Sequence, residues 1–381
     1  MKITSVETFL VPPRWLFCRI ATDEGIVGWG EPVVEGRAET VRTAVAELSD
    51  HLVGADPLRI EDHWQVLTRG GFYRGGPVLS SAVAGIDQAL WDIAGKAYRA
   101  PVHALLGGPV RERIRMYAWA YGDSPEELAE AARERIRVGY TAVKICPTGV
   151  LGSLGPPAAI NSIVDRVAAV REAIGASHDL AVDLHGRASI PLARQLLPLI
   201  AEHAPLFVEE PLRPELSDQI GRITSATTVP VATGERLYSR QEFRTVLEAG
   251  VAVVQPDASH AGGISEVRRI AALAEIYDAQ LAPHCPLGPI ALAACLQVGF
   301  ATPNLLIQEQ SLDVHDHAGR DWAAYLTDTS MFTLRDGWIH RPPAPGLGVE
   351  VDEDAVRRAD AVGHRFRSPV WRHTDGSFAE W

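Results

Sequence analysis

The chain has 381 residues, four cysteines and a formal net charge of -12 at pH 7. Its 46% hydrophobic and 22% charged residues are typical of a soluble globular protein with a large buried core. The acidic charge argues against nucleic acid and against an anionic membrane surface as the main partner. The cysteines form no CxxC pair, and no signal peptide or membrane span is recognisable. We therefore expect a cytoplasmic protein without structural zinc.

The first 113 residues predict an α+β domain. Asp23, Glu24 and Gly25 form a turn signal between the second and third of three apolar runs. Helical patterns follow these runs without a regular strand-helix alternation. The predicted strands are 3–11, 15–22 and 25–31, and the predicted helices are about 37–53, 58–69 and 78–97.

From about residue 114 to residue 319, strands and helices alternate. Strand candidates occur at 115–121, 141–146, 180–185, 205–210, 229–235, 251–257, 279–284 and 304–309. The last six each carry an ionisable residue at or near the end, and these residues are 22 to 27 positions apart: Asp183, Glu209, Glu235, Asp257, His284 and Glu309. A strand, a helix and two short loops occupy about 25 residues. The pattern predicts a parallel β/α barrel with its reactive groups at the strand ends that form barrel active sites.

Two further segments interrupt or follow this rhythm. The glycine- and proline-rich stretch 147–157 predicts an irregular loop on the active-site side, after the second barrel strand. Residues 320–381 contain Pro342, Pro343 and Pro345 and few helical patterns. We expect this last segment to run back and complete the N-terminal domain.

Three carboxylates end neighbouring predicted strands. Asp183, Glu209 and Glu235 follow the third, fourth and fifth barrel strands, so they should converge on one point. Close carboxylates repel one another unless a cation lies between them, and an all-oxygen ligand set suits Mg²⁺. The alternative for each residue alone is a helix cap or a surface ion pair. Glu210 has the opposite strand parity to Glu209, and parity alone does not say which of the two faces inward.

Two histidines should flank this cluster. His185 lies two positions after Asp183, so on one strand both would point to the same face. His284 belongs to the seventh strand, across the barrel from the third. Asp257 on the sixth strand could orient the His284 imidazole and raise its basicity. This arrangement predicts an acid-base pair.

Two more ionisable residues have competing interpretations. Glu309 could hydrogen-bond a developing oxyanion or orient the substrate, or it could form a salt bridge at the barrel mouth. Lys144 on the second strand could steady the substrate carboxylate, or it could bridge the metal-binding carboxylates.

In these residues and their order, the chain resembles the mandelate-racemase subgroup of the enolase superfamily. The matching segments cover nearly the whole chain: 72–77 (FYRGGP), 85–92 (GIDQALWD), 183–187 (DLHGR), 232–236 (ATGER), 255–257 (QPD), 283–289 (PHCPLGP), 308–311 (QEQS), 371–373 (WRH) and 379–381 (AEW). The resemblance implies a (β/α)₇β modified TIM barrel, residues 114–319. It also implies an α+β capping domain, residues 1–113, completed by residues 320–381.

The resemblance also implies which residues bind the metal. By analogy with the family, Mg²⁺ would be bound by Asp183, Glu209 and Glu235, so that Glu209 rather than Glu210 would be the metal ligand on the fourth strand.

For the remaining residues the resemblance implies catalytic roles. His284, paired with Asp257, would remove the proton at C2 of a sugar acid. His185 would protonate the leaving C3 hydroxyl, and Glu309 would hydrogen-bond the intermediate. Such an elimination needs a cation on the carboxylate and a general acid near C3.

We therefore predict a dehydratase that converts D-galactonate to 2-keto-3-deoxy-D-galactonate and water. Its partners would be a small sugar-acid substrate and further copies of itself, in a homo-oligomer. The alternatives are a dehydratase of another aldonate or aldarate, a 2-hydroxy-acid racemase or epimerase, and a non-catalytic sugar-acid-binding protein. Racemases of the subgroup have K-x-K on the second strand and dehydratases have Asn at the second position, whereas this chain has Lys144-Ile145-Cys146. A neutral thiol is a poor base, so Cys146 argues against the racemase.

Overall fold

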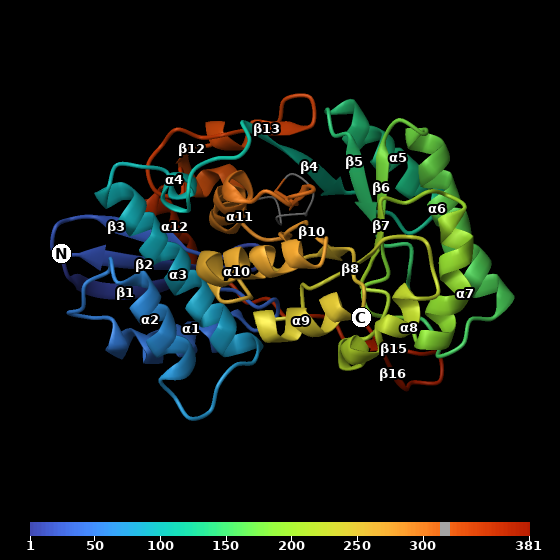
Figure 1. Cartoon of the computed structure of the whole chain (residues 1–381), viewed down its shortest axis with the longest axis horizontal. Coiled ribbons are helices and arrows are strands. Elements are labelled where there is room, and N and C mark those ends of the chain that lie inside the picture. Colours follow the sequence, from blue (N-terminus) through green and yellow to red (C-terminus); the bar gives the residue numbers. More distant parts are fainter. Residues whose placement is uncertain (313–320) are drawn as a thin grey trace.

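The computed structural model describes residues 1–312 and 321–381. It contains a capping domain at one end and a β/α barrel at the other (Figure 1). The predicted boundary between residues 319 and 320 lies outside the described residues. Among those residues, no helix is both long enough and apolar enough to cross a membrane.

An antiparallel sheet and a group of helices form the capping domain. The sheet has the order β1-β2-β3. The elements are β1 (Ile3–Val11), β2 (Trp15–Thr22), β3 (Val27–Gly30), α1 (Ala38–Leu48), η1 (Ser49–His51), α2 (Ile60–Arg69), α3 (Pro77–Ala97) and α4 (Val102–Leu105). A Cβ atom on Gly30 would lie 1.9 Å from the carbonyl oxygen of Gly85, so glycine is needed where α3 lies directly on β3. The three strands and three main helices confirm the predicted α+β character.

Eight parallel strands in the described part of the chain form the barrel, in the order β10-β9-β8-β7-β6-β5-β4-β11. A parallel bridge between Leu281 and Leu305 closes the remaining gap. The strands are β4 (Arg113–Trp119), β5 (Ala142–Ile145), β6 (Asp179–Asp183), β7 (Phe207–Glu209), β8 (Val231–Thr233), β9 (Val253–Val254), β10 (Gln280–Leu281) and β11 (Gln308–Gln310). All eight overlap segments predicted as strands, although β4 begins two residues earlier, β6 begins one residue earlier and β11 ends one residue later than predicted.

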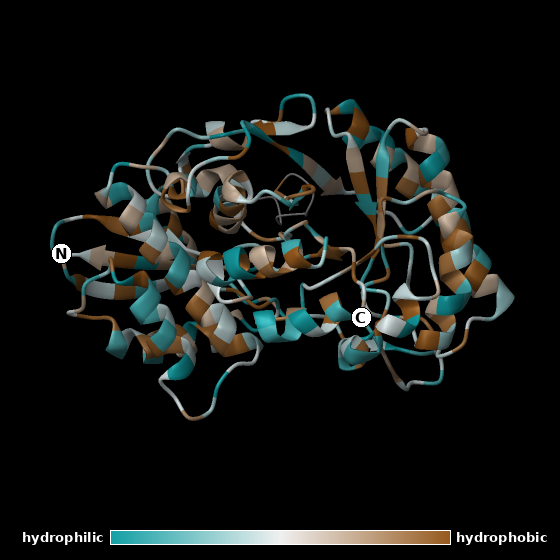
Figure 2. Ribbon diagram, viewed as in Figure 1, coloured by the Kyte–Doolittle hydropathy of each residue, from teal (hydrophilic) through white to brown (hydrophobic). Residues whose placement is uncertain are grey.

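Helices connect the barrel strands and cover them. They are α5 (Pro125–Arg137), α6 (Pro157–Ile174), α7 (Ile190–Ala201), η2 (Pro214–Gln219), α8 (Gly221–Thr224), α9 (Arg240–Glu248), α10 (Gly263–Ile276) and α11 (Pro289–Ala301). Helix α5 begins with a capping box, in which Ser124 and Glu127 bond each other's backbone N–H groups. Figure 2 shows outer helices such as α7 with alternating hydrophilic and hydrophobic stretches, as expected for helices with one face on the barrel. Helix α11 is buried over nearly its whole length.

Side chains fill the barrel interior and lead up to the site. One buried residue from each strand or its edge forms this inner cluster: Tyr117, Ala142, Ala181, Phe207, Ala232, Val253, Ala282 and Ile307. Asp183 and Glu209 lie two positions after Ala181 and Phe207, so the strand alternation points them to the same inward side. The interior is therefore closed below, and the acidic residues lie at its C-terminal end.

The C-terminal segment contacts both halves of the molecule. Its elements are η3 (Trp322–Tyr325), β12 (Leu326–Asp328), η4 (Ser330–Phe332), β13 (Trp338–His340), β14 (Glu350–Val351), α12 (Glu353–Ala361), β15 (Trp371–Arg372) and β16 (Phe378–Ala379). Helix α12 packs on the capping domain through ion pairs from Glu353 to Arg19 and from Asp360 to Arg42. Strand β13, however, pairs with β4 of the barrel, and Glu380 lies 3.8 Å from Arg213 beyond β7. The segment thus returns to the capping domain as expected and also reaches the barrel, which was not expected.

Candidate active site

Three acidic residues meet at the C-terminal ends of three adjacent strands. Asp183 ends β6, Glu209 ends β7, and Glu235 follows β8 by two residues. Asp183 and Glu209 are direct partners in the parallel ladder. One carboxylate oxygen from each of the three residues lies within 4.8 Å of the others. The structure therefore brings together the predicted metal ligands.

Two oxygens of this cluster are buried without a hydrogen-bond partner, Asp183 Oδ2 and Glu209 Oε2. Burial raises the pKa of Asp183 to about 7 and that of Glu209 to about 8, which reflects the cost of holding both charges without a cation. Unpaired buried carboxylate oxygens that converge are the donor set that Mg²⁺ takes. The residues present therefore fit a divalent oxygen-liganded cation.

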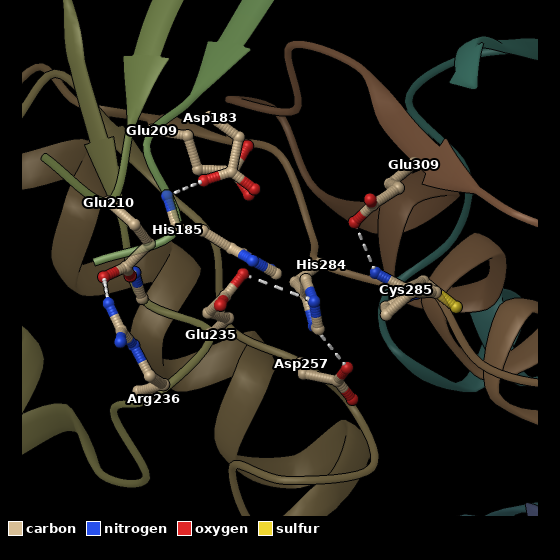
Figure 3. A network of polar contacts seen from close by, with 12 residues as sticks. Asp183, His185, Glu209, Glu210, Glu235, Arg236, Asp257, His284, Cys285 and Glu309 are labelled. Carbon is tan, nitrogen blue, oxygen red and sulfur yellow. Dashed lines mark hydrogen bonds and ion pairs between the residues drawn. The ribbon is translucent and has the colours of Figure 1, made fainter. Parts of the chain in front are cut away.

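The neighbouring Glu210 has a different role. Its backbone φ is +43°, and its Oε1 accepts hydrogen bonds from Thr233 Oγ1 at 2.7 Å and from the Gly234 N–H at 3.0 Å. Its Oε2 pairs with Arg236. Figure 3 shows Glu210 directed toward Arg236 and away from Asp183 and Glu209. Glu209, and not Glu210, therefore belongs to the acidic cluster.

Lys144 lies beneath the cluster, fully buried. Its Nζ is 2.6 Å from Glu209 Oε1, 2.8 Å from Glu309 Oε1 and 4.0 Å from Asp183 Oδ2. The ammonium also lies 4.5 Å from the centre of the Trp119 ring. These contacts favour the bridging interpretation of Lys144 over direct binding of the substrate.

Glu309 is an acceptor on both of its oxygens. Trp119 Nε1 and Lys144 Nζ donate to Oε1, and the Cys285 N–H donates to Oε2 at 2.8 Å. Burial alone would raise the pKa of Glu309, but the Lys144 charge holds it below its usual range. A carboxylate in this state cannot donate a hydrogen bond to an oxyanion. The contacts favour the salt-bridge interpretation, with Glu309 also anchoring the backbone next to His284.

His284 and Asp257 form the predicted pair. Asp257 Oδ2 accepts from His284 Nδ1 at 2.8 Å, and His284 Nε2 lies 3.3 Å from Glu235 Oε2 (Figure 3). Burial alone would lower the pKa of His284, but the charges of Glu235 and Asp257 raise it well above its usual range. With Nδ1–H held by Asp257, only Nε2 can exchange a proton with a bound molecule.

His185 differs from its predicted position. Strand β6 ends at Asp183, and His185 has a left-handed backbone with φ of +56°, so it lies in the loop and not on the strand. Its N–H donates to Asp183 Oδ1 at 2.6 Å. This turn, followed by Gly186 at φ +64°, still brings the His185 ring into the cavity. The expected proximity is present, but the same-face argument that led to it was wrong.

Arg187 was not identified from the sequence. Its Nη2 donates to His185 Nδ1 at 3.0 Å, and its Nη1 donates to the carbonyl oxygen of Thr148 and lies 3.2 Å from Cys146 Sγ. The guanidinium is 4.5 Å from the centre of the Trp371 ring. Burial raises the pKa of the Cys146 thiol, so the thiol stays neutral, as expected.

A cavity of about 630 Å³ opens over these groups. His185, His284 and Glu235 line it, and so do Trp371 and Trp381 from the C-terminal segment. The loop after β5 contributes Pro147, Thr148 and Gly149, in agreement with its predicted place. The capping domain contributes Arg14, Val34 and Glu35.

One further histidine, His260, lines the same cavity. Its Nδ1 lies 3.8 Å from Asp257 Oδ2 and 3.4 Å from the carbonyl oxygen of Glu235, while its Nε2 has no hydrogen-bond partner. His260 lies three positions after Asp257 in the sequence. This closeness to a predicted site residue is the one feature of the sequence that could have identified it.

Comparison with known proteins agrees with this geometry. Residues 3–107 match the family "Mandelate racemase / muconate lactonizing enzyme, N-terminal domain", and residues 127–355 match "Enolase C-terminal domain-like". D-galactonate dehydratase of Ralstonia nicotianae is 50% identical and that of Cronobacter sakazakii 49% identical, each over 100% of both chains.

A crystal structure of a putative galactarate dehydratase from Agrobacterium radiobacter, with Na and L-malate bound, has a TM-score of 0.91 to this chain. It is 34% identical, with 100% of both chains covered. The full-length matches, the capping domain and the (β/α)₇β barrel show that the chain belongs to the mandelate racemase / muconate lactonizing enzyme family of the enolase superfamily.

Proposed function

We propose that the chain is a Mg²⁺-dependent dehydratase whose substrate is the sugar acid D-galactonate. The observation that carries the proposal is that His284, held by Asp257, and His185, held by Arg187, line one cavity next to the acidic cluster. The relatives that are 49–50% identical over the full chain are D-galactonate dehydratases, which supports this substrate over other aldonates.

Asp183, Glu209 and Glu235 would hold the cation. Mg²⁺ bound there would withdraw charge from the substrate carboxylate and make the C2 proton more acidic. Lys144 balances part of the acidic charge from below, and Glu210 stays bound to Arg236 outside the cluster.

His284 and His185 divide the proton transfers. A cation on the Glu235 carboxylate would offset the charge that raises the pKa of His284 and would leave Nε2 unprotonated. His284 Nε2 then takes the C2 proton, while Asp257 accepts the Nδ1–H and stabilises the imidazolium. The electron pair of the C2–H bond moves first onto the substrate carboxylate to give an enediolate, and it then forms the C2–C3 double bond as the C3–O bond breaks.

His185 gives its Nε2 proton to the leaving oxygen, and water departs. The negative charge left on the ring faces the guanidinium of Arg187 at Nδ1, which stabilises it until the ring is protonated again. The enol then loses its C2 hydroxyl proton and gains a proton at C3, and so becomes the 2-keto-3-deoxy acid.

Cys146 disfavours the racemase alternative. Returning a proton to the opposite face of C2 needs a second base, and a buried thiol with a raised pKa does not provide it. We further propose that the enzyme works in the cytoplasm, because a net charge of -12 and four cysteines without a CxxC pair suit a soluble enzyme in a reducing compartment. A homo-oligomer is proposed as well.

The test is a screen of hexonates, pentonates and aldarates with Mg²⁺, with 2-keto-acid formation as the readout. We expect the value of kcat/KM to be highest for D-galactonate. A higher kcat/KM for another sugar acid would contradict the proposal that D-galactonate is the substrate. If no compound yielded a keto acid, the proposal that the protein is a dehydratase would be wrong.

A further inference from the structure

A residue of the capping domain caps a helix of the barrel next to His284. The N-cap residue of α11 is Gly288, four positions after His284, and it has no side chain to accept hydrogen bonds from the free N–H groups of the first turn. The carboxyl group of Glu31, directly after β3, accepts them instead. Its Oε1 accepts from the Gly288 N–H at 2.7 Å, and its Oε2 accepts from the Ala291 N–H at 2.9 Å.

This cap is tightly enclosed. Glu31 is fully buried, and a Cβ atom on Gly288 would lie 2.6 Å from Glu31 Oε1 and 2.9 Å from the Trp15 ring. A second side chain of the capping domain holds the same loop, because Arg14 Nη2 donates to the carbonyl oxygen of Pro286 at 3.1 Å. The capping domain therefore fixes the loop that joins β10 to α11.

Gln88 on α3 holds the neighbouring loop, which follows β9. Its Nε2 donates to the carbonyl oxygen of Ala258 at 2.8 Å and to Ser259 Oγ at 3.2 Å. The Ser259 N–H in turn donates to Asp257 Oδ1 at 2.6 Å, so the position of Ser259 sets that of the Asp257 carboxylate. Gln88 is fully buried, and its Oε1 accepts the Glu31 N–H at 2.8 Å.

These contacts and the hydrogen bond between His284 and Asp257 form a closed ring. We propose that Glu31 and Gln88 are positioning residues that set the distance between His284 and Asp257. Neither of them lines the catalytic cavity, so they act through the two loops and do not touch the substrate. This role rests on the proposed function, in which His284 takes the C2 proton.

Small displacements of these loops should slow proton removal. A base must lie within hydrogen-bond reach of the proton it removes, and a displacement of about 1 Å can lower the rate roughly a hundredfold. In Glu31→Gln the amide keeps one acceptor oxygen but turns its NH₂ group toward the second N–H of α11, so two donors face each other. Gln88→Met is similar in length and removes the contacts with Glu31 and with the loop after β9.

The test is steady-state kinetics with D-galactonate and with C2-deuterated D-galactonate, in Mg²⁺ buffer. In both variants we expect kcat to fall by about ten- to a hundredfold while KM stays within about threefold of the wild type. The deuterium isotope effect on kcat should rise, because proton removal becomes slower relative to the other steps. A substrate with fluoride at C3 should not restore turnover, because the general acid His185 is unchanged.

Proton NMR of the Mg²⁺-loaded protein without substrate reports on the same positions. The Nδ1 proton of His284, which Asp257 accepts at 2.8 Å, should give a far-downfield resonance that is absent in Asp257→Asn. In Glu31→Gln and in Gln88→Met this resonance should move upfield or broaden, because the hydrogen bond lengthens. A variant that is merely less stable would keep the wild-type resonance in its folded fraction.

Asp87→Asn is the matched control. Asp87 is a buried acid on the same helix as Gln88, and it bonds the first turn of another barrel helix, α10, through Ser265. Asp87→Asn should leave kcat, the isotope effect and the downfield resonance unchanged. Equal changes in this control would show that such contacts only join the two domains, and would overturn the positioning role.

Two further results bear on the positioning role. Wild-type kcat and an unmoved resonance in both Glu31→Gln and Gln88→Met would overturn it. A wild type that turns over no sugar acid, with a resonance that moves in these variants and not in Asp87→Asn, would overturn the proposed function and leave the positioning of His284 intact.

Discussion

Arg187 donates a hydrogen bond from Nη2 to Nδ1 of His185, across 3.0 Å. A guanidinium has no acceptor, so the Nδ1 atom must be unprotonated and the ring proton must be on Nε2. Because Arg187 is held in turn by Thr148 and by the face of Trp371, the C-terminal segment helps to set the tautomer of His185. In this tautomer the proton is on the atom that must deliver it.

Replacing Arg187 should therefore impair only one half of the reaction. We expect Arg187→Gln to lower kcat by about ten- to a hundredfold with little change in KM, because the His185 tautomer is no longer specified. Exchange of the C2 proton with solvent deuterium should continue, and a substrate with fluoride at C3 should restore turnover because fluoride leaves without a general acid.

The matched control for this substitution is Arg194→Gln, at an exposed position on α7, which should behave like the wild type. Equal loss of C2 exchange and of dehydration in Arg187→Gln would refute the positioning role.

Substitution of the adjacent residues Glu209 and Glu210 should affect Mg²⁺ binding differently. Glu209→Gln should weaken Mg²⁺ binding, measured by titration calorimetry, by more than about a hundredfold and abolish keto-acid formation. Glu210→Gln should still bind Mg²⁺ and should lower the free energy of unfolding by about 1–3 kcal/mol, because Arg236 loses its charged partner. Full activity in excess chelator would contradict the metal site.

The contact between the capping domain and the barrel should respond to pH. Asp87 on α3 is buried and accepts hydrogen bonds from Ser265 Oγ and N–H on α10, and burial raises its pKa from 3.8 to about 7. The fold therefore favours the protonated form of Asp87. Its contribution to the free energy of unfolding is complete below about pH 4, the pKa of Asp in an unfolded chain, and it is lost as the pH rises through about 7, the pKa in the folded chain.

Asp87→Asn cannot ionise, so the wild type's advantage in Tm over this variant should shrink by a few degrees, about 2–4 °C per kcal/mol, between pH 5 and pH 8. Asp165→Asn, at an exposed position on α6, is the control and should follow the wild-type curve. Parallel Tm curves for wild type and Asp87→Asn would show that Asp87 does not titrate in this range.

Cys146 should be dispensable as a base. Because its thiol stays neutral, Cys146→Ser should keep kcat for dehydration within about threefold of the wild type. A loss of activity as large as that of His284→Asn would show that the thiol takes part in proton transfer.

Much of the barrel and its acidic ring could be predicted because each strand-helix unit has nearly constant length. Strand ends therefore recur at regular intervals, and a parallel barrel gathers them at one mouth. The same periodicity could not show which of Glu209 and Glu210 faces the barrel interior, because adjacent strand residues point to opposite faces. In the structure, the ion pair of Glu210 with Arg236 shows that Glu209 is the residue in the acidic cluster.

Other features depend on contacts between segments far apart in the chain. Trp371 meets Arg187 only because the C-terminal segment folds back to the barrel, and no local pattern encodes that return. The position of His185 depends on a left-handed turn that a histidine does not signal. Lys144 and Glu309 could not be assigned, because their mutual ion pair joins strands β5 and β11.

The central claim is that the enzyme removes the C2 proton and eliminates the C3 hydroxyl without returning a proton to the opposite face of C2. The most direct measurement is NMR of D-galactonate incubated with the enzyme and Mg²⁺ in D₂O. We predict 2-keto-3-deoxy-D-galactonate with no C2 epimer, and no C2 exchange in His284→Asn. Formation of D-talonate at a rate comparable to that of the keto acid would contradict the account and favour the racemase.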